Sequence, residues 1–152
     1  MPHILIVEDE PSTSWALAEG LSDDGFTIDT FASAEEAWAW LQRNACDLVI
    51  SDLRLPGMSG LDLARKLARG RTRLRRGPAL PIIVVTAYGS PETLRDLAAA
   101  GVVECFPKPF PMDQLRRSVH RALDGAARSA RAADAGAARP RDRRPPARRK
   151  AA

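Results

Sequence analysis

Short apolar runs and longer helix-like segments alternate along the first 123 residues of this 152-residue chain. The apolar runs are rich in Val and Ile, which is typical of strands that are buried on both faces of a sheet. Strands are predicted at residues 3–7, 26–31, 48–51, 82–85 and 102–106. Amphipathic spacing and capping residues predict helices at residues 11–23, 33–41, 61–68, 91–100 and 112–123.

Strands that alternate with helices in this way pair in parallel, and right-handed crossovers place the helices on both faces of the sheet. The expected fold class is therefore α/β, a flavodoxin-like doubly wound sheet of five parallel strands in the order 2-1-3-4-5 with five helices. In this order the first and third strands are neighbours. Ligands collect where the carboxyl ends of such neighbours meet, so the side chains that follow these strands are the first candidates for a functional site.

Acidic side chains follow both of these strands. Glu8 and Asp9 come directly after the first strand, and Asp52 comes at the end of the third. A buried strand has no structural need for a carboxylate at its tip, and carboxylates that share a pocket raise one another's pKa. A divalent cation removes this conflict, and Mg²⁺ accepts a few carboxylates together with water and phosphate oxygens. We therefore expect a magnesium site at this edge of the sheet.

Two further polar side chains are expected at neighbouring strand ends, Thr86 after the fourth strand and Lys108 after the fifth. An ionised aspartate attacks phosphorus without a general base, while cations stabilise the charge on the transferring oxygens. This chemistry favours Asp52 as the phosphoacceptor. The Lys108 ammonium group would stabilise the charge of the phosphoryl group, and the Thr86 hydroxyl would donate a hydrogen bond to it. Glu8 and Asp9 would then hold the metal, and no organic cofactor is expected.

Four segments of the chain together resemble the receiver domain of bacterial two-component response regulators, over about residues 1–124. The matching segments are Ile-Val-Glu8-Asp9-Glu-Pro, Ser-Asp52-Leu-Arg-Leu-Pro-Gly-Met-Ser-Gly, Val-Val-Thr86-Ala-Tyr-Gly and Phe-Pro-Lys108-Pro-Phe. Each segment alone is a weak signal, but their order and spacing together are specific. The likeness is to single-domain receivers of the chemotaxis type.

The resemblance implies a phosphoacceptor that takes part in its own phosphorylation and dephosphorylation, rather than a dedicated enzyme. A sensor histidine kinase or a histidine phosphotransfer protein would phosphorylate Asp52 with Mg²⁺ present, and the backbone carbonyl of Arg54 would be the third protein ligand of the metal. The signal would leave by protein–protein contact, through a face built from the fourth helix, the fifth strand and the fifth helix.

The resemblance also implies a switch. Thr86 would move onto the phosphoryl group, and an aromatic side chain three residues before the lysine would turn inward. Cys105 occupies that position here, and Phe106 is expected to face the other side of the strand. Tyr88, two residues after Thr86, is placed to supply part of the signal. We therefore expect a smaller conformational shift on phosphorylation than an aromatic residue at position 105 would give.

The charge of the chain is divided unevenly at Gly125. Residues 126–152 carry nine Lys or Arg and two Asp, a net charge of +7, whereas the preceding residues carry fourteen Lys or Arg and seventeen Asp or Glu, a net charge of −3. The tail contains mostly Ala, Arg and Pro, so residues 125–152 are expected to be a basic, disordered segment with some helix at its start. The arginine-rich stretch from Arg69 to Arg76 is expected to be an exposed loop.

Two other functions remain open. The basic tail could bind nucleic acid under the control of the receiver domain, because arginine binds phosphate well, although a solvated linker has the same composition. A phosphate-ester hydrolase of the haloacid-dehalogenase type would need a second aspartate two residues after Asp52, where the chain has Arg54. Each site residue also has an ordinary explanation, such as the stabilisation of a helix N-terminus by Glu8 and Asp9.

A cytoplasmic location without membrane insertion is expected. The two cysteines, Cys46 and Cys105, lie far apart in the sequence, and no signal-peptide pattern follows Met1. No apolar run approaches the roughly 20 residues that a membrane-spanning helix needs.

Overall fold

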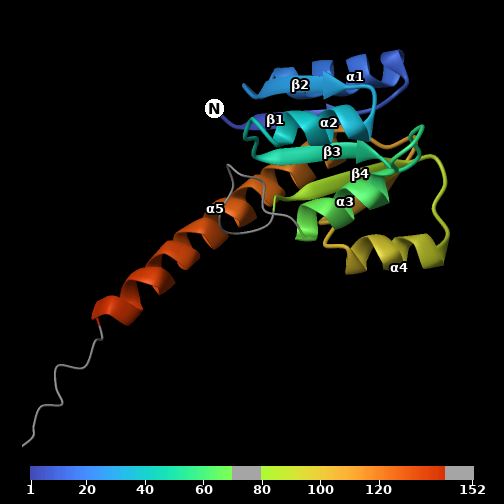
Figure 1. Cartoon of the computed structure of the whole chain (residues 1–152). Helices are drawn as coiled ribbons and strands as arrows, with labels where there is room; N and C mark the ends of the chain where they lie inside the picture. Colours follow the sequence, from blue (N-terminus) through green and yellow to red (C-terminus); the bar gives the residue numbers. More distant parts are fainter. Residues whose placement is uncertain (70–79, 143–152) are drawn as a thin grey trace, which may run out of the picture.

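The computed structural model describes residues 1–69 and 80–142 and contains a five-stranded parallel sheet in the order β2-β1-β3-β4-β5 (Figure 1). The strands are β1 His3–Val7, β2 Thr27–Phe31, β3 Leu48–Asp52, β4 Ile82–Thr86 and β5 Glu104–Pro107. The helices are α1 Pro11–Ser22, α2 Ala34–Leu41, α3 Gly60–Arg69, α4 Pro91–Ala99 and α5 Met112–Asp142. The predicted α/β fold class and strand order are confirmed.

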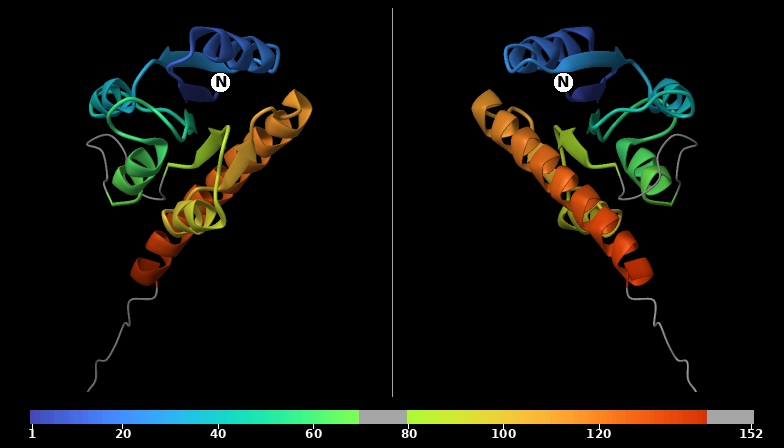
Figure 2. Two further views of the ribbon diagram at one scale, coloured as in Figure 1. Left: turned by 90° about the vertical axis from the view of Figure 1, so that its right-hand side faces the viewer. Right: turned by 90° about the vertical axis from the view of Figure 1, so that its left-hand side faces the viewer.

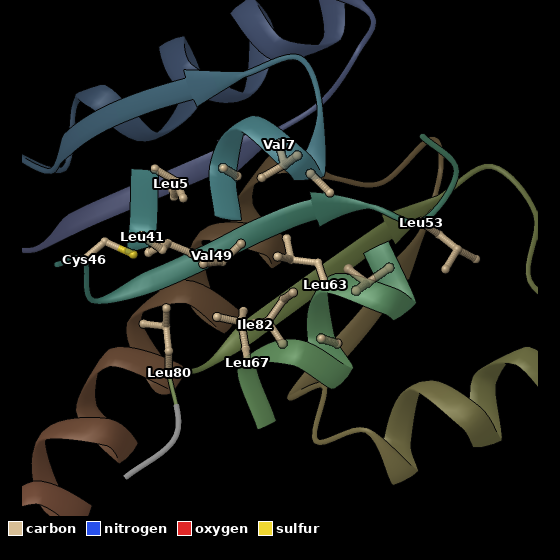
Figure 3. Packing of buried hydrophobic residues seen from close by; sticks show 14 of the residues in the cluster. Leu5, Val7, Leu41, Cys46, Val49, Leu53, Leu63, Leu67, Leu80 and Ile82 are labelled. Atoms are coloured by element: carbon tan, nitrogen blue, oxygen red, sulfur yellow. The ribbon is translucent and has the colours of Figure 1, made fainter. Parts of the chain in front are cut away.

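Helices cover both faces of this sheet, as the two side views in Figure 2 show. On one face, Leu5, Val49 and Ile82 of the central strands pack against buried side chains of α2, α3 and α4. Figure 3 shows these three residues close to Leu41 of α2 and Leu63 of α3. The alternate side chains of the same strands pack against α1 and α5 on the other face. The central strands are therefore buried on both sides, which explains their continuous apolar sequence.

Helix capping fixes how the chain enters α1 and α2 beside the ends of the strands. The Glu10 carboxylate accepts the Ser12 N–H at 3.0 Å, and Pro11 takes the first turn of α1. At α2, the Ser33 hydroxyl accepts the Glu36 N–H at 3.1 Å, as the sequence predicted for a capping residue. The first turn of α2 also contains Glu35.

Helix α5 is longer than the sequence analysis predicted. It was expected to end at residue 123, with some further helix at the start of a disordered segment that begins at residue 125. It continues to Asp142, and in Figure 1 its red end extends beyond the sheet. Alanine and arginine are strong helix formers, and here this propensity outweighs the lack of large apolar side chains. The rest of the tail, residues 143–152, lies outside the described residues, as do residues 70–76 of the expected arginine-rich loop.

Strand β5 begins at Glu104 rather than at the predicted residue 102. The Val102 N–H donates to the carbonyl of Leu97 at 3.1 Å, and Gly101 has a positive φ of 90°. Val102 therefore completes the turn that ends α4 and does not belong to the strand.

Within residues 1–69 and 80–142, none of the helices combines the length and the hydropathy that crossing a bilayer requires.

Gly60, the first residue of α3, lies very close to the end of β3. A β-carbon at this position would clash with the carbonyl oxygen of Asp52 and would lie 3.0 Å from the α-carbon of Leu53. Both are backbone atoms and cannot turn aside. We therefore expect Gly60→Ala to lower the free energy of unfolding by about 1–3 kcal/mol, as overpacking typically does, measured by urea denaturation.

Gly125→Ala is the matched control for this prediction. Nothing lies within 4 Å of a β-carbon built at Gly125, which is inside α5. Because alanine is about 0.8–1.0 kcal/mol more favourable than glycine inside a helix, this variant should be slightly more stable than the wild type. A similar rise in stability for Gly60→Ala would show that the backbone of Asp52 and Leu53 does not restrict the size of the side chain at position 60.

Candidate phosphoacceptor and metal site

The carboxyl ends of the central strands meet at one edge of the sheet and bring residues from distant parts of the chain together. In β1, Val7 is paired with Ser51 of β3, so Glu8 follows β1 next to Asp52. In turn, Asp52 is paired with Val85 of β4. Both Glu8 and Asp52 are buried, although they are charged residues. Glu8 and Asp52 therefore lie side by side at this edge of the sheet, as the strand order predicted.

Lys108, which follows β5, joins the two buried carboxylates. Its Nζ donates to Glu8 Oε1 at 2.8 Å and to Asp52 Oδ2 at 2.9 Å. The exposed fraction of the side chain is 1% for Glu8, 10% for Asp52 and 22% for Lys108. An ion pair in such a position holds together groups that would be costly to bury alone. The ammonium group is thus the counter-charge of the site in this state.

The electrostatic environment shifts the pKa of two of these groups. Burial raises the pKa of the Glu8 carboxyl, although the hydrogen bond from Lys108 and the one from the Glu10 N–H at 3.2 Å oppose this shift. Burial alone would lower the pKa of Lys108, but its hydrogen bonds to Glu8 and Asp52 outweigh burial and raise it. Lys108 is therefore an ammonium ion at neutral pH.

The carboxylates also form a set that suits a divalent cation. One oxygen from each of Glu8, Asp9 and Asp52 lies within 4.8 Å of the others. The Asp9 side chain is exposed and has no hydrogen bond or ion pair with another residue of the described chain. Hard carboxylate oxygens are ligands that Mg²⁺ prefers, and it keeps several waters. The donor set fits Mg²⁺, provided that the cation competes with Lys108 for Glu8 and Asp52.

Arg54 lies at the rim of this set. Its backbone N–H donates to Asp52 Oδ1 at 3.3 Å, and among residues 1–69 and 80–142 nothing donates a hydrogen bond to its carbonyl. Its guanidinium carbon lies 5.6 Å from the centroid of the Tyr88 ring, a cation–π contact between the β3–α3 loop and the β4–α4 loop. The sequence analysis used only the carbonyl of Arg54 and missed this side-chain contact, for which the sequence has no signal.

Thr86 lies at the same edge but does not contact the carboxylates. It is buried at the end of β4, where its hydroxyl donates to the carbonyl of Tyr88 at 2.8 Å and accepts the Tyr88 N–H at 3.2 Å. The hydroxyl has no described hydrogen bond to Asp52 or to the Lys108 side chain, although the Lys108 backbone N–H donates to the Thr86 carbonyl at 2.7 Å. The hydroxyl is therefore engaged by its own loop in this structure.

Cys105 and Phe106 of β5 face opposite sides of the sheet. Cys105 is half-buried and packs against the cluster that contains α3 and α4, whereas Phe106 is buried with α5, where its ring lies 6.1 Å from that of Phe110. Burial raises the pKa of the Cys105 thiol. Phe106 thus cannot replace an aromatic side chain at position 105.

A hollow of about 460 Å³ lies beside Glu8 and Asp9. It is lined by these two residues, by the facing part of α1, and by the end of β2, including Phe31, with the residue that follows it. Trp15 of α1 lies at this hollow and is 66% exposed. An exposed indole next to the acidic pocket is a suitable contact for a partner protein.

Comparison with known proteins identifies the family of this chain. Residues 4–120 match the response regulator receiver domain family. The chain is 37% identical over 121 residues to the C4-dicarboxylate transport transcriptional regulatory protein DctD of Rhizobium meliloti, covering 80% of this chain and 25% of DctD. It is 41% identical over 120 residues to the phosphate regulon transcriptional regulatory protein PhoB of the same organism, covering 78% of this chain and 51% of PhoB.

Solved structures of receiver domains are also similar to this chain. A CheY-like response regulator receiver domain protein from Methanospirillum hungatei superposes with a TM-score of 0.76 at 27% identity, covering 84% of this chain and 98% of that one. The receiver domain of a putative Luxo repressor from Vibrio parahaemolyticus gives a TM-score of 0.75 at 28% identity, covering 83% and 92%. The chain spans about a quarter of the length of DctD and half that of PhoB. This chain therefore belongs to the response regulator receiver domain family, as its motifs predicted.

Proposed function

We propose that this protein is a phosphoaccepting response regulator in which Asp52 takes a phosphoryl group from a phosphohistidine of a sensor histidine kinase or a histidine phosphotransfer protein. The observation that supports this most directly is the position of Lys108, whose ammonium group joins the buried carboxylates of Glu8 and Asp52. A carboxylate held beside a fixed cation at a strand end is suited to attack phosphorus and to stabilise the product.

In this proposal an Asp52 carboxylate oxygen attacks the phosphorus of the phosphohistidine. A new oxygen–phosphorus bond forms, the phosphorus–nitrogen bond breaks, and its electron pair returns to the imidazole of the donor. The Lys108 ammonium stabilises the charge on the phosphoryl oxygens, and Thr86 would add a hydroxyl hydrogen bond once Tyr88 releases it. Glu8, Asp9, Asp52 and the Arg54 carbonyl would hold Mg²⁺, which would supply further positive charge at the transferring oxygens.

The same residues would assist the hydrolysis of the phosphoryl group from Asp52. The chain would therefore take part in its own phosphorylation and dephosphorylation without turning over a separate substrate.

We place the receiver domain at residues 1–124. This placement is supported by the burial of Leu115, Val119 and Ala122 in the first part of α5, which ends the core. A cytoplasmic location would suit the kinase partner.

The test uses the wild-type protein with Mg²⁺ and a small phosphodonor such as acetyl phosphate. We expect intact mass spectrometry to show the addition of one phosphoryl group, which peptide mapping places between residues 48 and 60, and we expect EDTA to prevent it. Addition that is indifferent to EDTA, or that maps to another part of the chain, would contradict the proposal.

We propose that output passes through the face formed by α4, β5 and α5. Exposed apolar side chains on and beside this face support the proposal, with exposed fractions of 44% for Leu94 of α4 and 52% for Val103 next to β5.

The protein that phosphorylates Asp52 would bind at another surface. The hollow beside Asp9 and Trp15 would receive this kinase or phosphotransfer protein.

The switch would depend on Thr86, Tyr88 and Cys105. For Thr86 to reach a phosphoryl group on Asp52, its hydroxyl must leave the Tyr88 carbonyl, and the Arg54 side chain on the Tyr88 ring opposes the movement of this loop. Because Cys105 is small and half-buried, it offers little area to couple that movement to α4. Tyr88 contributes to the resting position of the β4–α4 loop through its backbone hydrogen bonds to Thr86 and the contact of its ring with Arg54.

Tyr88→Ala is expected to strengthen binding of beryllium fluoride, a phosphoryl analogue, by about two- to fivefold, because an exposed cation–π contact is worth about 0.5–1 kcal/mol. The measurement is a fluorescence or calorimetric titration in saturating Mg²⁺. Tyr88→Phe keeps the ring beneath Arg54 and should bind like the wild type. Equal affinity of Tyr88→Ala and Tyr88→Phe would rule out a restraining role for the ring.

A further inference from the structure

The loop between β3 and α3 carries Arg54, whose carbonyl would bind Mg²⁺ in the proposed function. Backbone hydrogen bonds hold this loop at both of its ends. At the start, the Leu53 N–H donates to the carbonyl of Val85 at 2.9 Å. At the end, the Gly60 N–H donates to the carbonyl of Leu53, also at 2.9 Å. These bonds close the loop, but they do not fix the conformation of the residues between them.

The middle of the loop is anchored by Glu35, a residue of α2 that lies 23 positions earlier in the chain. Glu35 Oε2 accepts the Met58 N–H at 2.8 Å. Among residues 1–69 and 80–142, Glu35 is the only side chain from outside β3, the loop and α3 that is hydrogen-bonded to the backbone of residues 54–59. The anchor therefore couples α2 to the loop that carries Arg54.

The loop backbone is shaped around this carboxylate. Gly57 has a positive φ of 79°, and a β-carbon built on it would clash with Glu35 Oε2 and lie 3.2 Å from Glu35 Cδ. Only glycine adopts this backbone conformation without strain and also leaves room for the carboxylate. Pro56, whose φ is fixed, stands between Gly57 and the Arg54–Leu55 pair, so this part of the loop has one fewer backbone torsion that can rotate.

An ordinary role for Glu35 would be to stabilise the N-terminus of α2, since an acidic residue is favourable in a first helical turn. Glu36 is in the same turn, is also exposed, and has no side-chain partner in the described part of the chain. Stabilisation of the helix end therefore does not require Glu35 to reach Met58. The hydrogen bond to the loop is the feature that distinguishes the two residues.

We infer that Glu35 is a positioning residue for the Mg²⁺ site, because its hydrogen bond to the Met58 N–H holds the β3–α3 loop in the conformation that presents the Arg54 carbonyl beside Asp52. This inference rests on the proposed function, since it assumes that Mg²⁺ binds at Glu8, Asp9 and Asp52. Glu35 does not touch the metal and acts only through the loop. Its loss should weaken Mg²⁺ binding without changing the phosphoryl transfer that occurs once the metal is bound.

The experiment compares Mg²⁺ affinity, measured by isothermal titration calorimetry, for the wild type, Glu35→Ala, Glu35→Gln and Glu36→Ala. We expect Glu35→Ala to raise the Kd about tenfold, the lower end of the effect of losing an outer-shell partner. Glu35→Gln keeps an oxygen that can accept the Met58 N–H and should recover most of the affinity. Glu36→Ala removes an equal charge nearby and should change the Kd by less than about twofold, because exposed charges are screened.

Two further readouts separate positioning from a general loss of structure. Amide hydrogen exchange of the Mg²⁺-free protein should show faster exchange at Met58 in Glu35→Ala only. In saturating Mg²⁺, the rate of phosphorylation by acetyl phosphate should be the same for Glu35→Ala and the wild type.

Unchanged Mg²⁺ affinity in Glu35→Ala, with or without faster exchange at Met58, would overturn the inference, and so would an equal loss of affinity in Glu36→Ala. If the wild type itself bound no Mg²⁺, the proposed function would fail as well. Normal binding by the wild type together with normal binding by Glu35→Ala would remove only the role of Glu35.

Discussion

Asp52→Asn is expected to take up no phosphoryl group under conditions in which the wild type takes up one. Asp52 is 7% exposed at the end of β3, where one of its oxygens accepts a hydrogen bond from Lys108. An amide in the same place keeps the volume but is a poor nucleophile and cannot form an acyl phosphate. Removal of a nucleophile reduces rates by about 10³-fold or more, so intact mass spectrometry should show no adduct.

Asp47→Asn provides the matched control, because it makes the same chemical change just before the other end of the same strand. The Asp47 carboxylate accepts the backbone N–H of His3 at 2.8 Å and lies far from the pocket along β3. This variant should take up one phosphoryl group, as the wild type does. An adduct that persists in Asp52→Asn, or that disappears in Asp47→Asn, would remove Asp52 from its proposed role.

The fold could be predicted because burial on both faces leaves a clear pattern in the sequence. Strands β1, β3 and β4 each contain an unbroken apolar run, at residues 4–7, 48–50 and 82–85, and glycine, proline or capping residues mark the helix boundaries near them. The two larger errors fall where this pattern is weak. Val102 is apolar but completes the turn after α4. The Ala- and Arg-rich sequence after residue 123 has no large apolar residue whose spacing could predict the helix, which continues to Asp142.

The composition of the site could also be predicted, because strand order alone decides which side chains share an edge of the sheet. Its internal contacts could not. The hydrogen bond of the Thr86 hydroxyl to Tyr88 and that of Glu35 to Met58 both depend on loop conformations. The Pro56–Gly57 pair predicts a turn from local sequence, but the side chain from α2 that contacts this turn is set by tertiary structure, which no local pattern of residues specifies.

Lys108 has two roles in this arrangement, and they oppose each other. Its ammonium group would stabilise a phosphoryl group on Asp52, but in the present state it occupies oxygens of both Glu8 and Asp52. A divalent cation must therefore compete with it for those oxygens. Removal of the ammonium group should destabilise the metal-free protein and, at the same time, strengthen its response to Mg²⁺.

Lys108→Met is expected to lower the free energy of unfolding of the metal-free protein by about 3 kcal/mol at pH 7, the lower end of the range for breaking a buried ion pair. The lower end applies because Lys108 is 22% exposed. Methionine keeps most of the apolar part of the side chain, so the loss reports mainly the ammonium group with its charge and its two hydrogen bonds. Arg117→Met is the control, since the pair of Arg117 with Asp113 is exposed, and it should change stability by no more than about 0.5 kcal/mol.

The pH dependence of Lys108→Met gives the prediction a second, independent readout. The pKa of Glu8 is already raised by burial, and the loss of the Lys108 hydrogen bond, which lowers it, should raise it further. A carboxyl with a raised pKa in the folded state favours folding when it is protonated, and this contribution is lost as the pH rises through that pKa. The variant should therefore regain stability as the pH falls from 7 toward about 4.3, the ordinary pKa of a glutamate, and more steeply than the wild type.

Addition of Mg²⁺ at pH 7 completes the test. Because no ammonium group competes for Glu8 and Asp52 in Lys108→Met, a given concentration of Mg²⁺ should raise its melting temperature more than that of the wild type. Equal stabilisation of the two proteins by Mg²⁺ would mean that the cation does not use the oxygens that Lys108 occupies. A metal-free variant as stable as the wild type would mean instead that the ion pair does not compensate the burial of Glu8 and Asp52.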